Sequence, residues 1–415
     1  MWRFGEDRGW GGSPPGTNVF ALPDCVRAYP IGGARTHSVS GNQVFASEDR
    51  LPLPQTGDIA LCRIPPKGVS MVASRRLLQL SAAVTAAALL MSACSSSSDD
   101  QAEPTSTSSG GAFPVTVDHA FGETTVDAEP TRVVSVGYTE QDTLLALGVK
   151  PVGVTEWYGE QPFATWPWAQ EALGDSQPEV LDISDGFQYE RIVGLEPDLI
   201  IATNAGLDQE SYDRLSEIAP TIAQSGDSSA SFSPWDEQAR NIGAAVGKTD
   251  EIEDIIAGID EKFAAARAEH PEFEGTKAIF LQNAIYEGDA IAYQNGLSTD
   301  FLTDLGFVVP SDLDAFAPAD GSGQAYIPLE NLSVLDSADV LLWGTEKPED
   351  RTALEQERVY QNLERVKENK LVFTDAVTAG AIYFTSPLSL PYVIDQLVPA
   401  FASTLAGEGA ATTTS

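Results

Sequence analysis

The sequence predicts an α/β fold of two lobes joined by a single long helix. Short β-branched runs at 132–136, 151–154 and 198–202 alternate with segments of helical period, which is typical of βα units around a largely parallel sheet. About 300 residues of this pattern exceed one ordinary hydrophobic core, so we expect two lobes. A pair of motifs that recurs in the same order in both halves supports this expectation.

Residues 1–70 contain no segment that we expect to form a helix or a strand. They are dense in Gly and Pro and show neither the strand period nor the helix period. We interpret them as a misassigned start or as disordered, with translation beginning at Met71.

A processing signal is predicted over 71–93. Two arginines precede the apolar run 77–90, and the small residues Ser92 and Ala93 lead directly to Cys94. This pattern resembles the lipobox of bacterial lipoproteins, which implies that Cys94 is lipidated and anchors the protein outside the cell membrane. The alternatives are a buried helix or a short membrane anchor, but the run is shorter than the roughly 20 residues that span a bilayer.

The composition of the processed chain limits its chemistry. Residues 94–415 retain one cysteine, so neither a disulfide nor a sulfur-bound metal is expected. They carry 15 basic and 55 acidic residues, a formal charge of −40. Such a charge repels nucleic acid and anionic lipid, and most of it is explained by a solvated surface.

The mature chain divides at changes of composition. The Ser/Thr/Gly-rich segment 94–113 is predicted to be a flexible tether. An N-terminal α/β lobe is expected over 114–232 and a C-terminal α/β lobe over 271–408. Between them, 233–270 forms a helical linker whose second helix covers about 249–269 and ends at Pro271. A helix of that length spans about 30 Å, enough to cross from one lobe to the other.

Two motifs form the internal repeat. Residues 142–149 match 300–307, where in each a helix ends at a Gly and an apolar strand follows. Residues 190–201 match 330–342 with one inserted residue. The repeat therefore places Glu190 and Glu330 at equivalent positions.

Three segments together resemble a known family. The stretches 133–136, 147–154 and 189–201, with the long mid-chain helix, resemble the solute-binding lipoproteins of ABC importers for ferric siderophores and vitamin B12 over about 114–405. The resemblance implies two Rossmann-like lobes of the class III periplasmic-binding-protein type, with ligand held in a cleft between them. It also implies a monomer without catalytic activity or cofactor, whose partners are a ferric siderophore and a membrane permease.

In that family one glutamate on each lobe docks into arginine pockets of the permease. The resemblance assigns this role to Glu190 and Glu330, and two carboxylates on a rigid frame can each meet an arginine bidentately. The alternative is that each is a first-turn glutamate favoured by the helix dipole.

Ligand contacts are expected where strands of both lobes end, because open α/β sheets bind ligands outside their carboxyl ends. Aromatic side chains there suit a bulky ligand, and hydroxyl or amide groups can meet oxygens around a coordinated metal. Each aromatic could equally pack in the core. The candidates are Tyr138, Trp157, Tyr158, Phe187, Tyr189, Asn204, Asn283, Tyr286, Tyr293, Tyr326, Trp343 and Tyr383.

Charge narrows the expected ligand. The loop 182–189 contains no arginine, and basic residues are absent near most of these strand ends. A triscatecholate or citrate complex would therefore be poorly compensated, so we expect a neutral or cationic complex such as a ferric hydroxamate. Heme or a corrinoid remains an alternative.

Two other functions are weaker. A binding protein for a free divalent metal needs clustered ligands, but the mature chain has only His119 and His270, far apart. A hydrolase with two carboxylates could use Glu190 and Glu330, yet their repeat-equivalent placement suggests two outward surfaces. No nucleophile elbow or phosphate-binding glycine motif is present.

Overall fold

The computed structural model describes residues 113–226, 233–294, 296, 299–318 and 323–414. These fall within one compact unit, 99–415. The predicted signal 71–93, Cys94 and almost all of the predicted tether lie outside the described residues.

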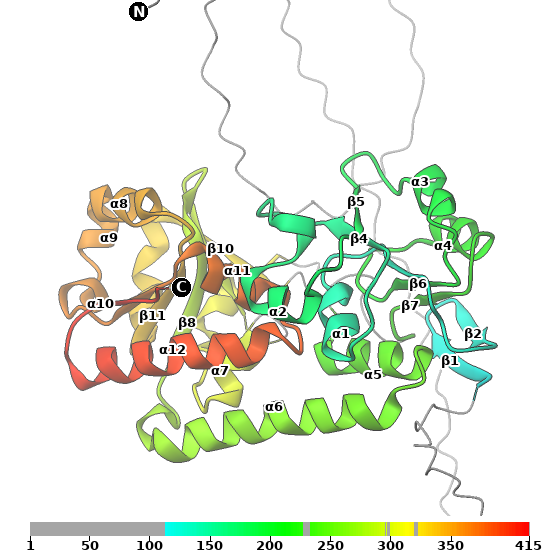
Figure 1. Cartoon of the computed structure of the whole chain (residues 1–415). Helices are drawn as coiled ribbons and strands as arrows, with labels where there is room; N and C mark the ends of the chain where they lie inside the picture. The colour runs from blue at the N-terminus through cyan, green and yellow to red at the C-terminus, as the bar shows by residue number, and fades with distance from the viewer. Residues whose placement is uncertain (1–112, 227–232, 295, 297–298, 319–322, 415) are drawn as a thin grey trace, which may run out of the picture. The chain divides into compact units, whose positions relative to one another are not determined.

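The first lobe is built on a five-stranded sheet in which every neighbouring pair is parallel (Figure 1). The order is β5-β4-β3-β6-β7. The strands are β3 (Val133–Ser135), β4 (Gly153–Glu156), β5 (Glu179–Asp182), β6 (Leu199–Ala202) and β7 (Thr221–Ala223). Central strands β3 and β6 are buried along their whole length, which explains their continuous apolar sequences.

Helices cover both faces of this sheet. One face packs against helices α1, α5 and the first half of α6, and against the hairpin of β1 and β2. The other packs against α3 and α4. The bounds are β1 (Val115–His119), β2 (Gly122–Val126), α1 (Glu140–Ala146), α2 (Gln170–Leu173), α3 (Tyr189–Gly194), α4 (Gln209–Ser216) and α5 (Trp235–Ala245), with 3-10 turns η1 (Pro162–Ala164) and η2 (Pro167–Ala169).

The second lobe is built on a mixed six-stranded sheet of order β10-β9-β8-β11-β12-β13. Strands β8, β11, β12 and β13 are parallel, whereas β9 and β10 add antiparallel at one edge. The bounds are β8 (Ala278–Tyr286), β9 (Asp289–Tyr293), β10 (Gln324–Pro328), β11 (Val340–Gly344), β12 (Leu371–Phe373) and β13 (Ala411–Thr412).

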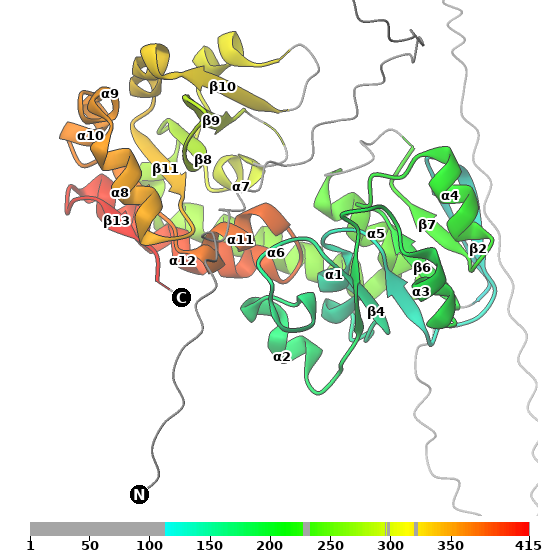
Figure 2. The ribbon, with the colours of Figure 1, turned by 90° about the horizontal axis from the view of Figure 1, so that it is seen from above.

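This second sheet is also covered on both faces (Figure 2). The end of α6 and helices α7, α11 and α12 pack on one face, and η6, α8 and α9 pack on the other. The bounds are α7 (Asp300–Asp304), η5 (Ser311–Phe316), η6 (Leu329–Ser337), α8 (Pro348–Gln356), α9 (Arg358–Gln361), α10 (Glu364–Lys367), α11 (Ala376–Phe384) and α12 (Ser389–Ala406), with η3 (Pro271–Phe273) after α6.

Helix α6 (Thr249–Glu269) belongs to both cores. Ile252 and Ile256 pack in the first lobe, whereas Ile259 and Phe263 pack in the second. Its 21 residues span about 30 Å. The predicted fold class, two α/β lobes joined by one long helix, is therefore confirmed. The predicted lobe boundaries stay predictions.

In the part of the chain that the structure describes, no helix combines the length and the apolar character needed to cross a membrane.

Candidate functional site

Side chains from both lobes meet in a continuous row of aromatic rings. Trp157 and Tyr158 follow β4, Tyr138 follows β3, and Tyr383 and Phe384 end α11. The ring of Tyr158 lies 4.8 Å from Trp157 and 6.2 Å from both Tyr383 and Phe384, between centroids. We name this row the aromatic ladder and define it as Tyr138, Trp157, Tyr158, Tyr293, Tyr383 and Phe384.

The two ends of the aromatic ladder lie on different sheets. Tyr138 lies 5.5 Å from Trp157 in the first lobe, and Tyr293 lies 6.4 Å from Tyr383 in the second. Tyr293 ends β9 and stacks on Phe280 of β8 at 4.8 Å. Five of the predicted ligand residues, Tyr138, Trp157, Tyr158, Tyr293 and Tyr383, are thus brought together.

Two tyrosine hydroxyls of the aromatic ladder are buried without a hydrogen-bond partner among the described residues. These are the Oη atoms of Tyr158 and Tyr383. Burial raises the pKa of both well above its usual value, and the carboxylate of Glu346 raises both further. Both hydroxyls are therefore neutral donors at physiological pH, and a buried donor left unpaired costs about 1–3 kcal/mol. A ligand oxygen would recover that cost.

Glu346 follows strand β11 and supplies the negative charge near these hydroxyls. Its backbone N–H donates to Oδ2 of Asp350 at 3.0 Å, which fixes the loop. Desolvation of the carboxyl group and the charge of Asp350 raise the pKa of Glu346, while Lys347 lowers it. Lys347 is itself paired with Asp350 at 3.9 Å.

A polar network extends the second-lobe end of the aromatic ladder. Oη of Tyr293 donates to Oε1 of Gln282 at 3.4 Å, and Nε2 of Gln324 donates to the same oxygen at 3.4 Å. Oη of Tyr326, on β10, donates to Oε1 of Gln324 at 3.0 Å. Tyr326 is 42% exposed, so this network reaches the surface.

The first-lobe loops under the aromatic ladder are held by a buried carboxylate. Glu140 accepts hydrogen bonds from the backbone N–H groups of Asn204 at 2.8 Å and Thr139 at 3.2 Å. A Cβ at Gly137 would lie 2.0 Å from its Oε1, so only glycine leaves room there. Burial raises the pKa of Glu140 to about 7, although those N–H groups lower it in part.

A second buried carboxylate joins the lobes directly. Oδ2 of Asp142, on α1, accepts hydrogen bonds from Oγ of Ser386 at 2.6 Å and from Nε1 of Trp168 at 2.8 Å. Ser386 lies between α11 and α12 of the second lobe. Burial raises the pKa of Asp142 to about 6, and these two hydrogen bonds lower it in part.

Three other predicted ligand residues, Asn204, Asn283 and Tyr286, are not part of the aromatic ladder. Asn204 is 2% exposed, and its carbonyl accepts from the N–H of Tyr138 at 3.1 Å, so it supports that loop. Asn283, with its amide nitrogen turned toward Asp350, donates to both carboxylate oxygens at 2.8 and 3.1 Å. Tyr286 is half-buried at the end of β8, where it pairs with Asp289.

Phe187 and Tyr189 lie elsewhere in the first lobe. They contact each other at 6.0 Å and pack beside the core of the sheet face that carries α3 and α4. Among the described residues, no ring contact joins either of them to the aromatic ladder. They were grouped with the other candidate ligand residues because their loop follows a strand. That strand is β5, which lies at the edge of the sheet.

The expectation that Trp343 lies at the cleft is corrected. Its side chain is fully buried among apolar residues of the face that carries η6, α8 and α9, with the ring of Tyr360 at 5.8 Å. Strand β11 is buried on both faces, so its last aromatic residue points into a core layer rather than beyond the sheet.

The two predicted docking glutamates are both exposed in the first turn of a short helix. Glu190 lies on α3 of the first lobe and Glu330 on the 3-10 helix η6 of the second. A hollow of about 350 Å³ lies next to Glu190, lined by residues 182, 184–188, 190 and 191.

Sequence reasoning missed three large aromatics and one acid. Trp166 and Trp168 stack at 5.1 Å and contact Phe384 at 6.0 and 5.3 Å, which backs the aromatic ladder. Their sequence, with a proline between the two tryptophans, marked a turn rather than a site. Glu346 could have been found from its position just beyond strand β11.

The described residues offer no group of three His, Cys, Asp or Glu side chains placed to hold a metal ion. His119 is buried and bonded to Thr124 Oγ1 at 2.8 Å, and burial lowers its pKa. His270 pairs with Glu272 at 3.0 Å.

Comparison with known proteins agrees with this architecture. The family model described as "Periplasmic binding protein" matches residues 133–378. The chain is 26% identical over 298 residues to the iron(3+)-hydroxamate-binding protein FhuD of Bacillus subtilis, covering 69% of this chain and 86% of that protein.

Solved structures give the same result. A periplasmic solute-binding protein from Mycobacterium smegmatis is 47% identical with a TM-score of 0.66, covering 72% of this chain and all of that one. Streptococcus pneumoniae PiaA, solved in complex with ferrichrome, is 26% identical with a TM-score of 0.61, covering 71% and 99%. This chain belongs to the periplasmic binding protein family, the family of solute-binding proteins that its motifs predict.

Proposed function

We propose that this protein captures a ferric siderophore of the hydroxamate type outside the cell and delivers it to an ABC importer permease. It does so as a monomer anchored to the membrane by a lipid on Cys94. The ligand itself is cargo, and the protein needs no cofactor. Relatives support the class of cargo, because FhuD is described as hydroxamate-binding and PiaA was solved with ferrichrome.

One observation carries the proposal for the ligand: the buried, unpaired hydroxyls of Tyr158 and Tyr383, one from each lobe, beside aromatic walls. A ferric hydroxamate has an apolar body for the rings and oxygens around the iron for these donors. Binding across both lobes would pair the two hydroxyls at once.

The charge near those hydroxyls supports a neutral or cationic complex. Glu346 is close enough to Tyr158, Tyr293 and Tyr383 to raise the pKa of each. An anionic triscatecholate or citrate complex would meet this carboxylate where screening by salt is weak.

Fluorescence titration tests the ligand. Ferrioxamine B, a cationic ferric hydroxamate, should quench tryptophan emission with tighter binding than a ferric triscatecholate at matched ionic strength. Tyr158→Phe and Tyr383→Phe should each weaken binding about 3- to 10-fold by removing one donor. Tyr360→Phe is the matched control, because its hydroxyl is also buried and unpaired but lies in the second-lobe core.

Two outcomes would contradict this assignment. Tighter binding of the ferric triscatecholate than of ferrioxamine B would refute the charge argument. In that case Glu346→Gln should leave the preference between the two complexes unchanged, whereas the charge argument expects Glu346→Gln to weaken the preference for ferrioxamine B. Equal loss of affinity in Tyr360→Phe would mean that the hydroxyls act through stability. The anchor is tested separately by mass spectrometry, where an unmodified peptide spanning Ala93 and Cys94 in membrane-associated protein would refute it.

A further inference from the structure

Most of the few cationic side chains of the first lobe contact one short helix, α3, or the residues next to it. The sequence from 114 to 232 contains only four Lys or Arg residues: Arg132, Lys150, Arg191 and Arg214. In the structure all three arginines bind α3 or the residues next to it, and α3 carries Glu190. The inference below rests on the proposed function, delivery of the ligand to a permease, and on the docking role that the family resemblance implies for Glu190.

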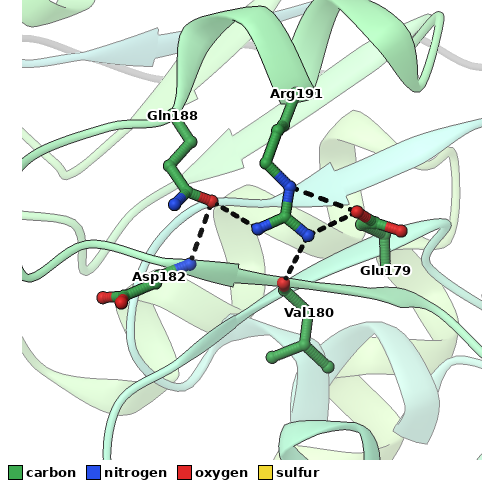
Figure 3. Close-up of polar contacts among 5 residues, drawn as sticks. All are labelled: Glu179, Val180, Asp182, Gln188 and Arg191. Atoms are coloured by element: carbon green, nitrogen blue, oxygen red, sulfur yellow. Dashed lines mark hydrogen bonds and ion pairs between the residues drawn. The ribbon is translucent and has the colours of Figure 1, made fainter.

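Arg191 ties the start of α3 to the edge of the sheet (Figure 3). Its Nη1 donates to Oε1 of Gln188, the residue before α3, at 2.7 Å. Its Nε donates to Oε1 of Glu179 at 3.1 Å and its Nη2 to the carbonyl of Val180 at 2.9 Å, both on β5. One guanidinium group therefore links the start of α3 to strand β5, directly beside Glu190.

Arg132 holds the other end of the same helix. Its Nε donates to the carbonyls of Leu195 at 3.0 Å and Glu196 at 3.1 Å, just past the last residue of α3. The remaining arginine, Arg214 of α4, lies over the ring of Tyr189 with its Cζ 3.6 Å from the centroid.

A six-residue helix needs this external support. Isolated helices shorter than about 12 residues are marginal in water, and Ile192 is the one residue of α3 that is fully buried, with Tyr189 and Leu195 partly buried beside it. Without the arginines, its direction would be set by these few apolar contacts. A fixed direction removes part of the ordering cost that a partner would otherwise meet on binding.

We propose that Arg132, Arg191 and Arg214 are positioning residues that hold α3 in one orientation, so that Glu190 is presented ready-made to a cationic pocket of the permease. The charges next to Glu190 agree with a cationic partner. The hollow beside it is lined by Asp182 and Asp185 as well as Glu190, while its one cation, Arg191, is already bound by Glu179 and Gln188. Val193 is 54% exposed one turn further along α3 and offers apolar contact to the same partner.

The experiment is a double-mutant cycle on docking. Full-length protein carrying a photo-crosslinking phenylalanine analogue at Val193 is titrated against membrane vesicles from its own cells, and the crosslinked permease is quantified. Glu190→Gln and Arg191→Ala should each weaken docking about tenfold or more. In the double variant, Arg191→Ala should add less than about twofold, because its effect passes through Glu190.

Arg240→Ala is the matched control. Its side chain is 41% exposed and paired with Asp236 and Glu253, close to the 42% exposure of Arg191, but it lies on α5. It should leave docking within about twofold of the wild type. Ferrioxamine B affinity should also stay within about twofold of the wild type in every variant, since α3 lies apart from the aromatic ladder. Arg191→Lys should recover docking only in part, because an ammonium group cannot make the several contacts of the guanidinium group.

The outcomes distinguish the docking role of Glu190 from the positioning role of the arginines. If Glu190→Gln leaves docking intact, the docking role of Glu190 fails and the positioning role with it. If Glu190→Gln weakens docking but Arg191→Ala does not, only the positioning role is refuted. It is also refuted if the two effects multiply in full, or if Arg240→Ala weakens docking equally.

Discussion

The two platforms that carry Glu190 and Glu330 hold the same place in the repeat but are fixed by different forces. The α3 platform is tied down at the surface by three arginines. The η6 platform instead buries Leu332 and Leu335 completely in the second-lobe core and follows Pro328. Its polar support is small: the N–H of Leu329 donates to the carbonyl of Gly288 at 3.1 Å.

This difference shows that a repeated backbone position does not need a repeated mechanism. In a chain with few cationic residues, three arginines support α3, a six-residue helix that fully buries one apolar side chain. In η6, where two leucines are buried, the described residues show no arginine side chain in that role; besides the Leu329 contact, the backbone N–H of Arg365 donates to Oδ1 of Asp336 at 3.2 Å.

The largest expected effect is on stability. Leu335→Ala should lower the free energy of unfolding by about 2–5 kcal/mol, because it leaves a cavity in a fully buried site. Arg132→Ala should cost under about 1 kcal/mol, since exposed polar contacts contribute little. Urea denaturation of both variants provides the measurement, and equal losses would break the distinction between the platforms.

A smaller effect is expected at the aspartates that follow each platform. Asp198 accepts hydrogen bonds from the N–H groups of Thr131 and Arg132 and from the Thr131 hydroxyl, all at 2.8 Å. Asp339, its repeat equivalent, accepts one from the N–H of Lys277 at 2.9 Å. Asp198→Asn should cost roughly 1–2 kcal/mol and Asp339→Asn less than about 1 kcal/mol.

The effect at Asp198 should depend on pH. Burial opposes its ionisation, but the hydrogen bonds from Thr131 and Arg132 outweigh burial and lower its pKa. Its stabilisation is therefore complete above the unfolded value near 4 and is lost as the pH falls through the lower folded value. Urea unfolding at pH 7 and in acid should show the cost of Asp198→Asn shrinking below about pH 4, and a constant cost would contradict this account.

The smallest effect concerns salt. Raising the salt concentration from 0.05 to 0.5 M should increase hydrogen exchange of the α3 amides by up to about fivefold, because it screens exposed ionic contacts. Amides of η6 should not change, since apolar burial is not weakened by screening. Hydrogen–deuterium exchange with peptide-level resolution compares the two platforms in one sample.

The sequence predicted the architecture well because its signals were periodic. The α6 interval 249–269 was predicted from helical period and a terminal proline, and the structure gives the same bounds. Positions just beyond β3 and β4 were also predictable, because the ends of parallel strands define one edge. Tyr138, Trp157 and Tyr158 come together there.

The rest of the candidate site could not be read from the sequence. A strand buried on both faces has no polar alternation, so nothing distinguished Trp343 in a core layer from an aromatic at the sheet edge. Phe384 ends a helix, and the aromatic residues that its ring contacts lie more than 200 residues away in the sequence. Long arginine side chains can reach in several directions, so their convergence on α3 required the folded chain.

Helix α6 couples the fates of the two lobes. Ile252 and Ile256 complete one core, and Ile259 and Phe263, within the same 21 residues, complete the other. If one core unfolded, the half of α6 that packs in it would be exposed. The other half, which the remaining core needs, would then fray. We therefore expect the lobes to melt as a single cooperative unit, and a protease cut in this one helix to be more destabilising than a cut in a loop.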